Sequence, residues 1–90
     1  NLSDAVLLLS RDGRVISCNP AGELLFGKPE SQILGQRLES LFGDNPAVGD
    51  LLQRTLDSGQ TQALNDETLM LQRRRHIVRM VTSPLLDTQD

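Results

Sequence analysis

The order of the predicted elements constrains the fold most strongly, because strand-like segments lie at the two ends of the chain and helix signals lie between them. Residues 5–10, 15–18, 61–72 and 76–86 are the predicted strands. Such grouping favours an α+β fold, with an antiparallel sheet and helices on one face, over an alternating arrangement. The predicted order is β-β-α-α-α-α-β-β. A chain of 90 residues can bury only one modest core, so residues 1–90 are expected to form a single domain.

The strands at each end are predicted to pair as hairpins. Ala5–Ser10 and Val15–Cys18 flank an Asp-Gly pair, which suits a tight connection, and β-branched side chains favour the pleated surface. The last two strands meet around Arg73–Arg75. Pro84 near the end of the second implies an edge, a bulge or a strand terminus, because proline cannot donate a ladder hydrogen bond.

The first helix is predicted to begin at Pro20. The side chain of Asn19 can accept hydrogen bonds from the free N–H groups of the first turn, and proline at the first helical position loses no bond. Gly27 is placed to end the helix in a left-handed conformation. Its apolar face is expected to consist of Ala21, Leu24 and Leu25.

Three further helices are predicted before the third strand. Residues 29–34 and 36–42 form two short ones of a turn or two, each followed by a glycine. The longer helix, 46–58, has Asn45 as its cap and Gly59 as its stop. Its apolar stripe consists of Val48, Leu51, Leu52 and Leu56.

The composition excludes several classes of partner. The net charge is −3 with acids and bases interspersed, so the basic surface needed for nucleic acid is missing. Phe26 and Phe42 are the only aromatic residues, which argues against a flavin, a haem or a base as ligand. The longest apolar run, Ala5–Leu9, is far below the roughly 20 residues of a membrane span. With Cys18 as the single cysteine, we expect a cytoplasmic protein that contacts neither nucleic acid nor membrane.

No catalytic or metal-binding constellation is visible in the sequence. His76 is the only histidine, no second ligand stands at suitable spacing, and we expect it on the surface at the start of a strand. Asp66 and Glu67 are adjacent and therefore face opposite sides of a strand. Cys18 is expected to be a small buried side chain. We predict that the chain is not an enzyme and holds no metal or cofactor.

Short motifs follow one another over nearly the whole chain: Asp4–Leu9, Asp12–Ile16, Asn19–Ala21 with Leu24–Gly27, Ile33–Gly35 followed by Leu38 and Leu41–Phe42, and Val81–Asp87. In their order and spacing they resemble a PAS domain, a sensory module of bacterial-type signalling proteins. Such domains usually have a fifth strand after the Ser-Pro strand, and the sequence stops at Asp90 before it. The resemblance therefore implies truncation at the C-terminal strand and an exposed central sheet edge, which would favour a homodimer.

The resemblance implies a module that binds a small ligand or mediates dimerisation and thereby regulates an attached output domain. The output domains that it suggests are a histidine kinase, a GGDEF/EAL diguanylate cyclase or phosphodiesterase, and a transcriptional regulator. Flavin-bearing members need a reactive cysteine in a helix and haem-bearing members a histidine on or near the long helix, and this chain has neither. The alternative is a purely structural dimerisation module with a filled core and no ligand.

In the family, the ligand site lies between the inner sheet face and the long helix. Its wall would here come from Val15, Ser17, Leu25, Leu38, Leu41, Leu52, Thr55, Leu56, Val78, Met80 and Thr82. Aliphatic walls of this kind form a solid core more often than a cavity. A ligand, if bound, should be small and largely apolar, with one polar group reaching Ser17, Thr55 or Thr82.

Overall fold

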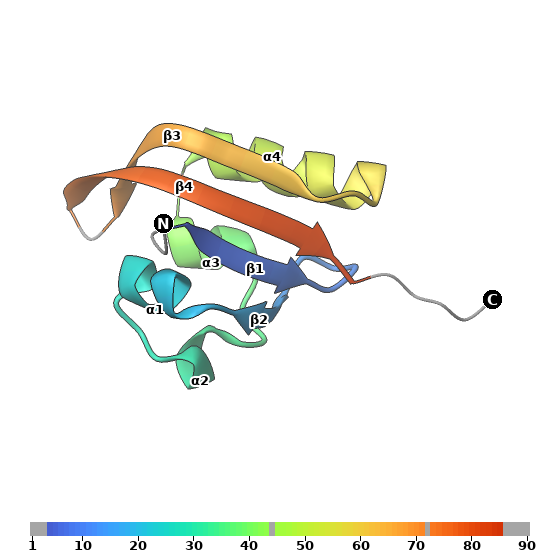
Figure 1. Cartoon of the computed structure of the whole chain (residues 1–90), viewed down its shortest axis with the longest axis horizontal. Coiled ribbons are helices and arrows are strands. Elements are labelled where there is room, and N and C mark those ends of the chain that lie inside the picture. The colour runs from blue at the N-terminus through green and yellow to red at the C-terminus, as the bar shows by residue number, and fades with distance from the viewer. Residues whose placement is uncertain (1–3, 44, 72, 86–90) are drawn as a thin grey trace.

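The computed structural model describes residues 4–43, 45–71 and 73–85. Its sheet contains β1 (Ala5–Leu9), β2 (Val15–Cys18), β3 (Gln62–Leu71) and β4 (Arg74–Pro84), in the spatial order β2-β1-β4-β3 (Figure 1). Between β2 and β3 lie α1 (Pro20–Phe26), α2 (Glu30–Ile33), α3 (Leu38–Phe42) and α4 (Pro46–Ser58). The predicted α+β class and element order are confirmed.

Two of the three strand pairings are the predicted antiparallel hairpins, and the third differs from the prediction. β1 and β4 run parallel, from Ala5 opposite Met80 to Leu9 opposite Pro84. The sheet is therefore mixed rather than wholly antiparallel. The expected exposed central edge is wrong for the described residues, because β1 and β4 satisfy one another's backbone groups. The two outer strands of this sheet are β2 and β3.

The strand boundaries lie close to those predicted. β4 begins two residues earlier than expected, at Arg74, because Arg73 takes φ 66° and turns the chain there. Pro84 is the last residue of β4, so its predicted position at a strand terminus is confirmed. The predicted strands also included Gln72 and Leu86, which lie outside the described residues.

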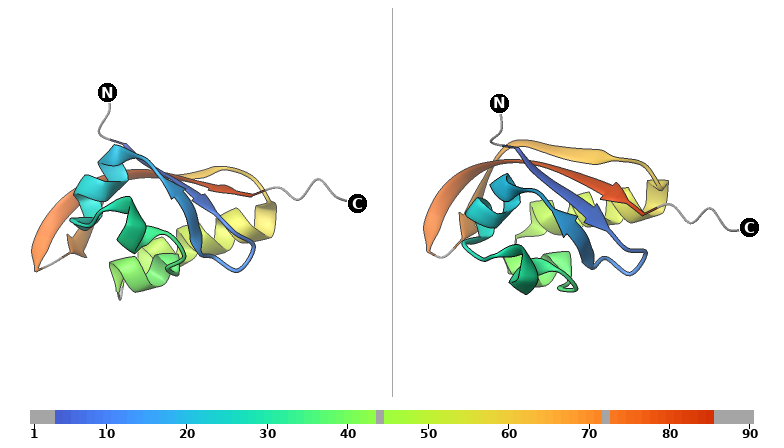
Figure 2. Two further views of the ribbon diagram at one scale, coloured as in Figure 1. Left: turned by 90° about the horizontal axis from the view of Figure 1, so that it is seen from below. Right: turned by 60° about the horizontal axis from the view of Figure 1, so that its bottom comes forward.

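The sheet curves over the helices, which leave its other face uncovered (Figure 2). Alternate residues of β1 and β4 point towards the helices, and Leu7, Leu9 and Thr82 have no exposed surface. A bulge at Asp66, whose φ is 51°, interrupts the register between β3 and β4. Such bulges bend a strand, which fits the strong curvature of β3 (Figure 1).

Helix α1 begins and ends as predicted, but its buried face differs. The Asn19 side chain accepts from the N–H of Gly22 at 3.0 Å, and Gly27 ends the helix at φ 67°. Gly22 and Phe26 are the buried residues of the helix, whereas Leu24 is 84% exposed. The prediction that Leu24 is buried is wrong. The helix turns its glycine towards the sheet instead.

The close approach of α1 to the sheet depends on Gly22. A Cβ atom on this glycine would lie 2.3 Å from Sγ of Cys18, far closer than such atoms approach. Asn19 fastens the same junction: its Oδ1 accepts from the N–H of Val6 at 2.9 Å and its Nδ2 donates to the carbonyl of Asp4 at 2.9 Å. One glycine and one asparagine therefore join α1 to the start of β1.

Helix α4 has the predicted bounds without the predicted side-chain cap. Asn45 occupies the N-cap position, but its Nδ2 donates to the carbonyls of Phe42 and Met70 and thereby ties the helix start to α3 and β3. The predicted helices of a turn or two are confirmed as α2 and α3. The fully buried residues of α4 are Val48, Leu51 and Thr55, and Leu52 and Leu56 are half-buried.

Candidate functional site

The space between the inner sheet face and α4 is densely packed. Six of the predicted wall residues are at most 2% exposed: Val15, Leu38, Thr55, Val78, Met80 and Thr82. Leu52 lies against the β1–β2 turn, where its Cδ1 is 3.4 Å from the place a Cβ would take on Gly13, and Leu56 lies beside it. Ser17 is exposed on β2 and does not belong to the inner face. Apart from Ser17, the wall residues named here pack in the core or against the β1–β2 turn.

The two buried threonines of the predicted wall are engaged with each other. The Thr55 hydroxyl donates to the carbonyl of Leu51 at 2.8 Å, and its oxygen lies 2.7 Å from that of Thr82. Since a hydroxyl has one proton, Thr82 donates to Thr55 in this arrangement. Neither hydroxyl has a proton left for a ligand. The pair instead links α4 to β4 inside the core.

A cavity of about 210 Å³ lies where the C-terminal ends of α1 and α3 meet the C-terminal end of β3. It is half-open and is lined by Leu25, Phe26, Leu41, Phe42, Gly43, Met70 and Leu71. Of the predicted wall, only Leu25 and Leu41 line it. The rings of Phe26 and Phe42 pack edge to face, with centroids 5.0 Å apart and planes at 70°, and so join α1 to α3.

Neither phenylalanine was among the predicted pocket residues. Each is the last residue of its helix and is followed by a glycine, and together they are the only aromatic residues of the chain. Their position at the helix ends and their rarity were the features of the sequence that could have drawn attention to them. They did not indicate that the two helix ends meet.

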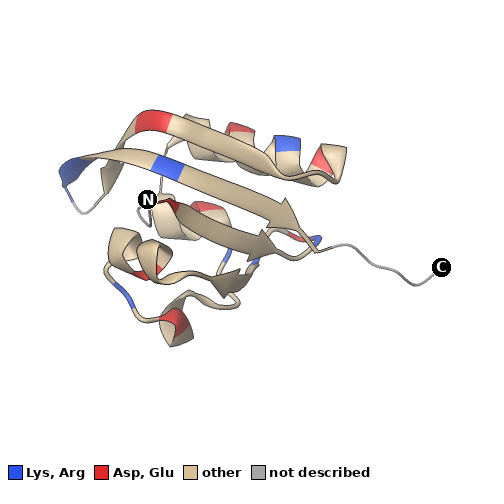
Figure 3. Ribbon diagram, in the orientation of Figure 1, with Lys and Arg blue, Asp and Glu red and all other residues tan. Residues whose placement is uncertain are grey.

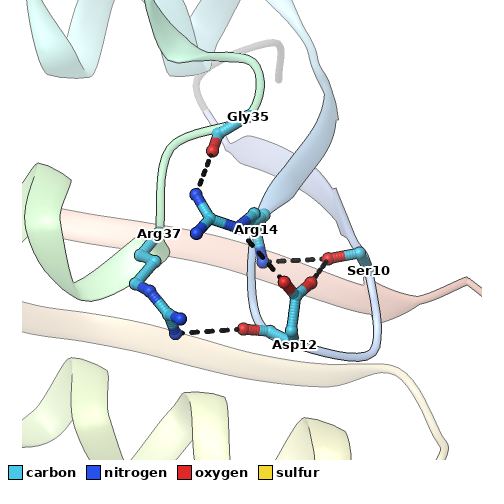
Figure 4. Close-up of polar contacts among 5 residues, drawn as sticks. All are labelled: Ser10, Asp12, Arg14, Gly35 and Arg37. Atoms are coloured by element: carbon cyan, nitrogen blue, oxygen red, sulfur yellow. Dashed lines mark hydrogen bonds and ion pairs between the residues drawn. The ribbon is translucent and has the colours of Figure 1, made fainter.

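At the opposite end of the sheet, polar side chains fasten the β1–β2 turn to the α2–α3 connection (Figure 4). Arg14 donates from Nη1 to the carbonyl of Gly35 at 2.8 Å and from Nε to Asp12 at 3.1 Å. Arg37 donates to the Asp12 carbonyl at 3.4 Å, and the Ser10 hydroxyl donates to the Asp12 carboxylate. The bond from Ser10, and after it the contact with Arg14, hold the pKa of Asp12 below its ordinary value.

Backbone bonds extend this attachment along β2. The N–H of Gly35 donates to the carbonyl of Val15 at 2.8 Å, and the N–H of Val15 donates to the carbonyl of Gln36 at 2.9 Å. The N–H of Leu38 donates to the carbonyl of Gly13 at 3.0 Å. The α2–α3 connection therefore covers part of the outer edge of β2, which blunts it against pairing with another chain.

Cys18 and His76 belong to no metal-binding cluster within the described part of the chain. Cys18 is buried as predicted, and burial, followed by the charges of Glu23 and Glu30, raises its pKa to about 11. His76 is half-buried in β4 rather than on the surface, and its Nε2 is buried without a hydrogen-bond partner. Within residues 4–43, 45–71 and 73–85, no group of three His, Cys, Asp or Glu side chains could hold a metal ion. No helix in the described part of the chain is long and apolar enough to cross a membrane.

Comparison with known proteins identifies the fold. A family profile described as the PAS fold matches residues 1–90. The chain belongs to the PAS family. Members of this family are regulatory modules of signalling proteins rather than catalysts, so this PAS domain is a sensory signalling module.

A solved structure supports the assignment. This PAS domain is similar to the PAS domain of nitrogen regulation protein NR(II) from Vibrio parahaemolyticus, with 30% sequence identity and a TM-score of 0.70. The match covers 98% of this chain and 81% of that one. The search of curated proteins found no match.

Proposed function

We propose that residues 1–90 form a single cytoplasmic sensor domain that regulates an attached output domain within a homodimeric signalling protein. The observation that carries this proposal is the 30% identity to the PAS domain of NR(II), a protein named for nitrogen regulation, over 98% of the chain. The proposed output is a histidine kinase, a GGDEF/EAL enzyme or a transcriptional regulator. An input can act only through its differential affinity for two arrangements of the domain.

The test compares two leucine-to-aspartate variants in the signalling protein that carries this domain. Leu7 is wholly buried in β1, so Leu7→Asp places a charge in the core and unfolds the domain. Leu24 is 84% exposed, so Leu24→Asp makes the same chemical change without that cost. We expect Leu7→Asp to remove the control of output activity and Leu24→Asp to retain it. Unchanged control after Leu7→Asp, with loss of the fold verified by circular dichroism, would contradict the proposal.

A structural dimerisation module with a filled core is the second candidate. The dense packing beneath α4 favours it, because six of the predicted pocket residues are at most 2% exposed. Native mass spectrometry of protein purified from its source, run intact and after denaturation, separates the two readings. A co-purifying mass that leaves on denaturation supports a ligand-binding sensor. A ligand-free dimer whose formation depends on concentration supports the structural module.

A further inference from the structure

The face of the sheet opposite the helices, here called the free face, carries apolar side chains that no described element covers (Figure 2). Since side chains alternate along a strand, the neighbours of buried Val78 and Met80 in β4 point to this face. One of them, Ile77, is 74% exposed. In register across three neighbouring strands stand Val6, Val81 and Ala63, of which Val6 is 44% exposed. Contiguous apolar surface of this kind marks an interaction site, whereas single exposed apolar residues do not.

The edges of the sheet are less open to a partner than the free face. The α2–α3 connection covers part of the edge of β2, through bonds such as that from the N–H of Gly35 to the carbonyl of Val15. On the other outer strand, β3, the bulge at Asp66 interrupts the ladder. Both features oppose the pairing of an edge with a strand of another chain. A partner of this sheet is therefore expected on the free face.

The charges on the free face balance one another. Arg79 lies on this face between Ile77 and Val81, and its Nε is 3.7 Å from Asp4 and 3.8 Å from Asp66. By the same alternation, exposed Arg75 points to this face. Both signs are visible on the neighbouring strands β3 and β4 (Figure 3). Two arginines thus stand with two aspartates, so no excess of one sign repels a second copy or attracts a highly charged partner.

The free face is large enough for a specific contact between two proteins. β4 has 11 residues, so at about 3.3 Å per residue it is about 36 Å long, and four strands spaced by about 4.8 Å span about 19 Å. The face therefore measures at most about 700 Å², and each partner in a stable complex buries about 800 Å². Since the sheet curves over the helices, a second copy would first meet the central strands β1 and β4.

We propose that two copies of this chain pair through the free face of the sheet, with Val6, Ile77 and Val81 at the centre of the contact. The same surface is used on both copies, as in a two-fold symmetric dimer. The apolar side chains form the buried centre, and Arg79 with its two aspartates forms part of the polar surroundings. This inference rests on the homodimer proposed above and adds where the two copies meet.

The test is analytical ultracentrifugation of the chain from about 1 µM to about 1 mM, where we expect a monomer–dimer equilibrium. Ile77→Asp should raise the dissociation constant at least about tenfold, because each copy would bury an unpaired carboxylate at the contact. Leu24→Asp, at an 84% exposed position of α1, introduces the same charge away from the free face and should change the constant less than about twofold. Both positions are exposed, so circular dichroism should show an intact fold in both variants.

Amide spectra of the ¹⁵N-labelled chain locate the contact without a substitution. On dilution, the signals of Val6, Ile77 and Val81 should shift as the dimer dissociates, and those of α4 should stay in place. A dimer that survives Ile77→Asp, weakens equally with Leu24→Asp or shifts only helical amides would overturn the free face and leave the homodimer standing. A chain that stays monomeric throughout would overturn both. Neither result bears on the control of output activity, which the Leu7→Asp variant tests.

Discussion

The buried hydroxyl pair between α4 and β4 predicts an asymmetry that can be measured. Valine is nearly isosteric with threonine, so replacing either residue removes polarity with little change in volume. In Thr82→Val, Thr55 keeps its bond to Leu51 and loses only an accepted bond, which costs about 0.5–1.5 kcal/mol of unfolding free energy. In Thr55→Val, the Thr82 hydroxyl is left fully buried without its acceptor, which costs about 1–3 kcal/mol.

The double variant removes both hydroxyls and leaves no buried donor unpaired. Its cost should therefore not exceed that of Thr55→Val alone, so the two single effects should fail to add by roughly 1 kcal/mol. Urea unfolding followed by circular dichroism gives the free energies, with equal m-values as the sign of an unchanged unfolded state. The exposed hydroxyl pair of Thr61 and Ser83, 2.8 Å apart, supplies the control, because Thr61→Val should cost close to nothing. Additive single effects, or a larger cost for Thr82→Val, would refute the assigned direction of the bond.

Three further outcomes are expected. Gly22→Ala should destabilise the fold because the added Cβ meets Sγ of Cys18, although alanine in place of glycine normally stabilises a helix by about 1 kcal/mol. Adding Cys18→Ala to the same chain should recover most of this loss, whereas stabilisation by Gly22→Ala alone would disprove the close contact. Asn19→Ala should lower the free energy of unfolding by about 2 kcal/mol and Asn45→Ala by less, because only the Asn19 side chain caps its helix. Equal losses of unfolding free energy in urea would contradict this. The Cys18 pKa is raised by folding, so its contribution to stability should be complete below pH 9.0 and lost as pH rises towards about 11; Cys18→Ala should remove this dependence, and an unchanged pH profile would contradict it.

Local signals in the sequence predicted the local structure well. The Asp-Gly turn, the capping Asn19 and the terminal glycines of α1 and α4 each act within a few residues, so their effect does not depend on the rest of the fold. Leu24 marks the limit of such reasoning. Ala21, Leu24 and Leu25 share a helical face, but so do Gly22, Leu25 and Phe26, and hydrophobicity alone ranks the glycine as the weaker contact.

Features that depend on distant partners could not be predicted in the same way. The parallel pairing of β1 with β4 joins two ends of the chain, and neither strand carries a local signal of its neighbour. The cavity depends on how the ends of α1 and α3 meet Leu71, which is a matter of angles between elements rather than residue type. The predicted pocket wall stays a prediction, and the packing of its members depends on the same kind of fit between elements. Val78 and Met80 of that wall are each at most 2% exposed.

The pairing of β1 with β4 also bears on the order of events during synthesis. Ala5 lies opposite Met80, so the two middle strands of the sheet cannot meet until the chain has been made as far as β4. Contacts between sequence-distant residues require the closure of a long loop before they contribute stability, which slows folding. Until then Leu7 and Leu9, which are wholly buried in the finished domain, lack the part of the core that β4 supplies. β4, which is made after β1, β2 and β3, is thus the strand that fixes β1 in its final place.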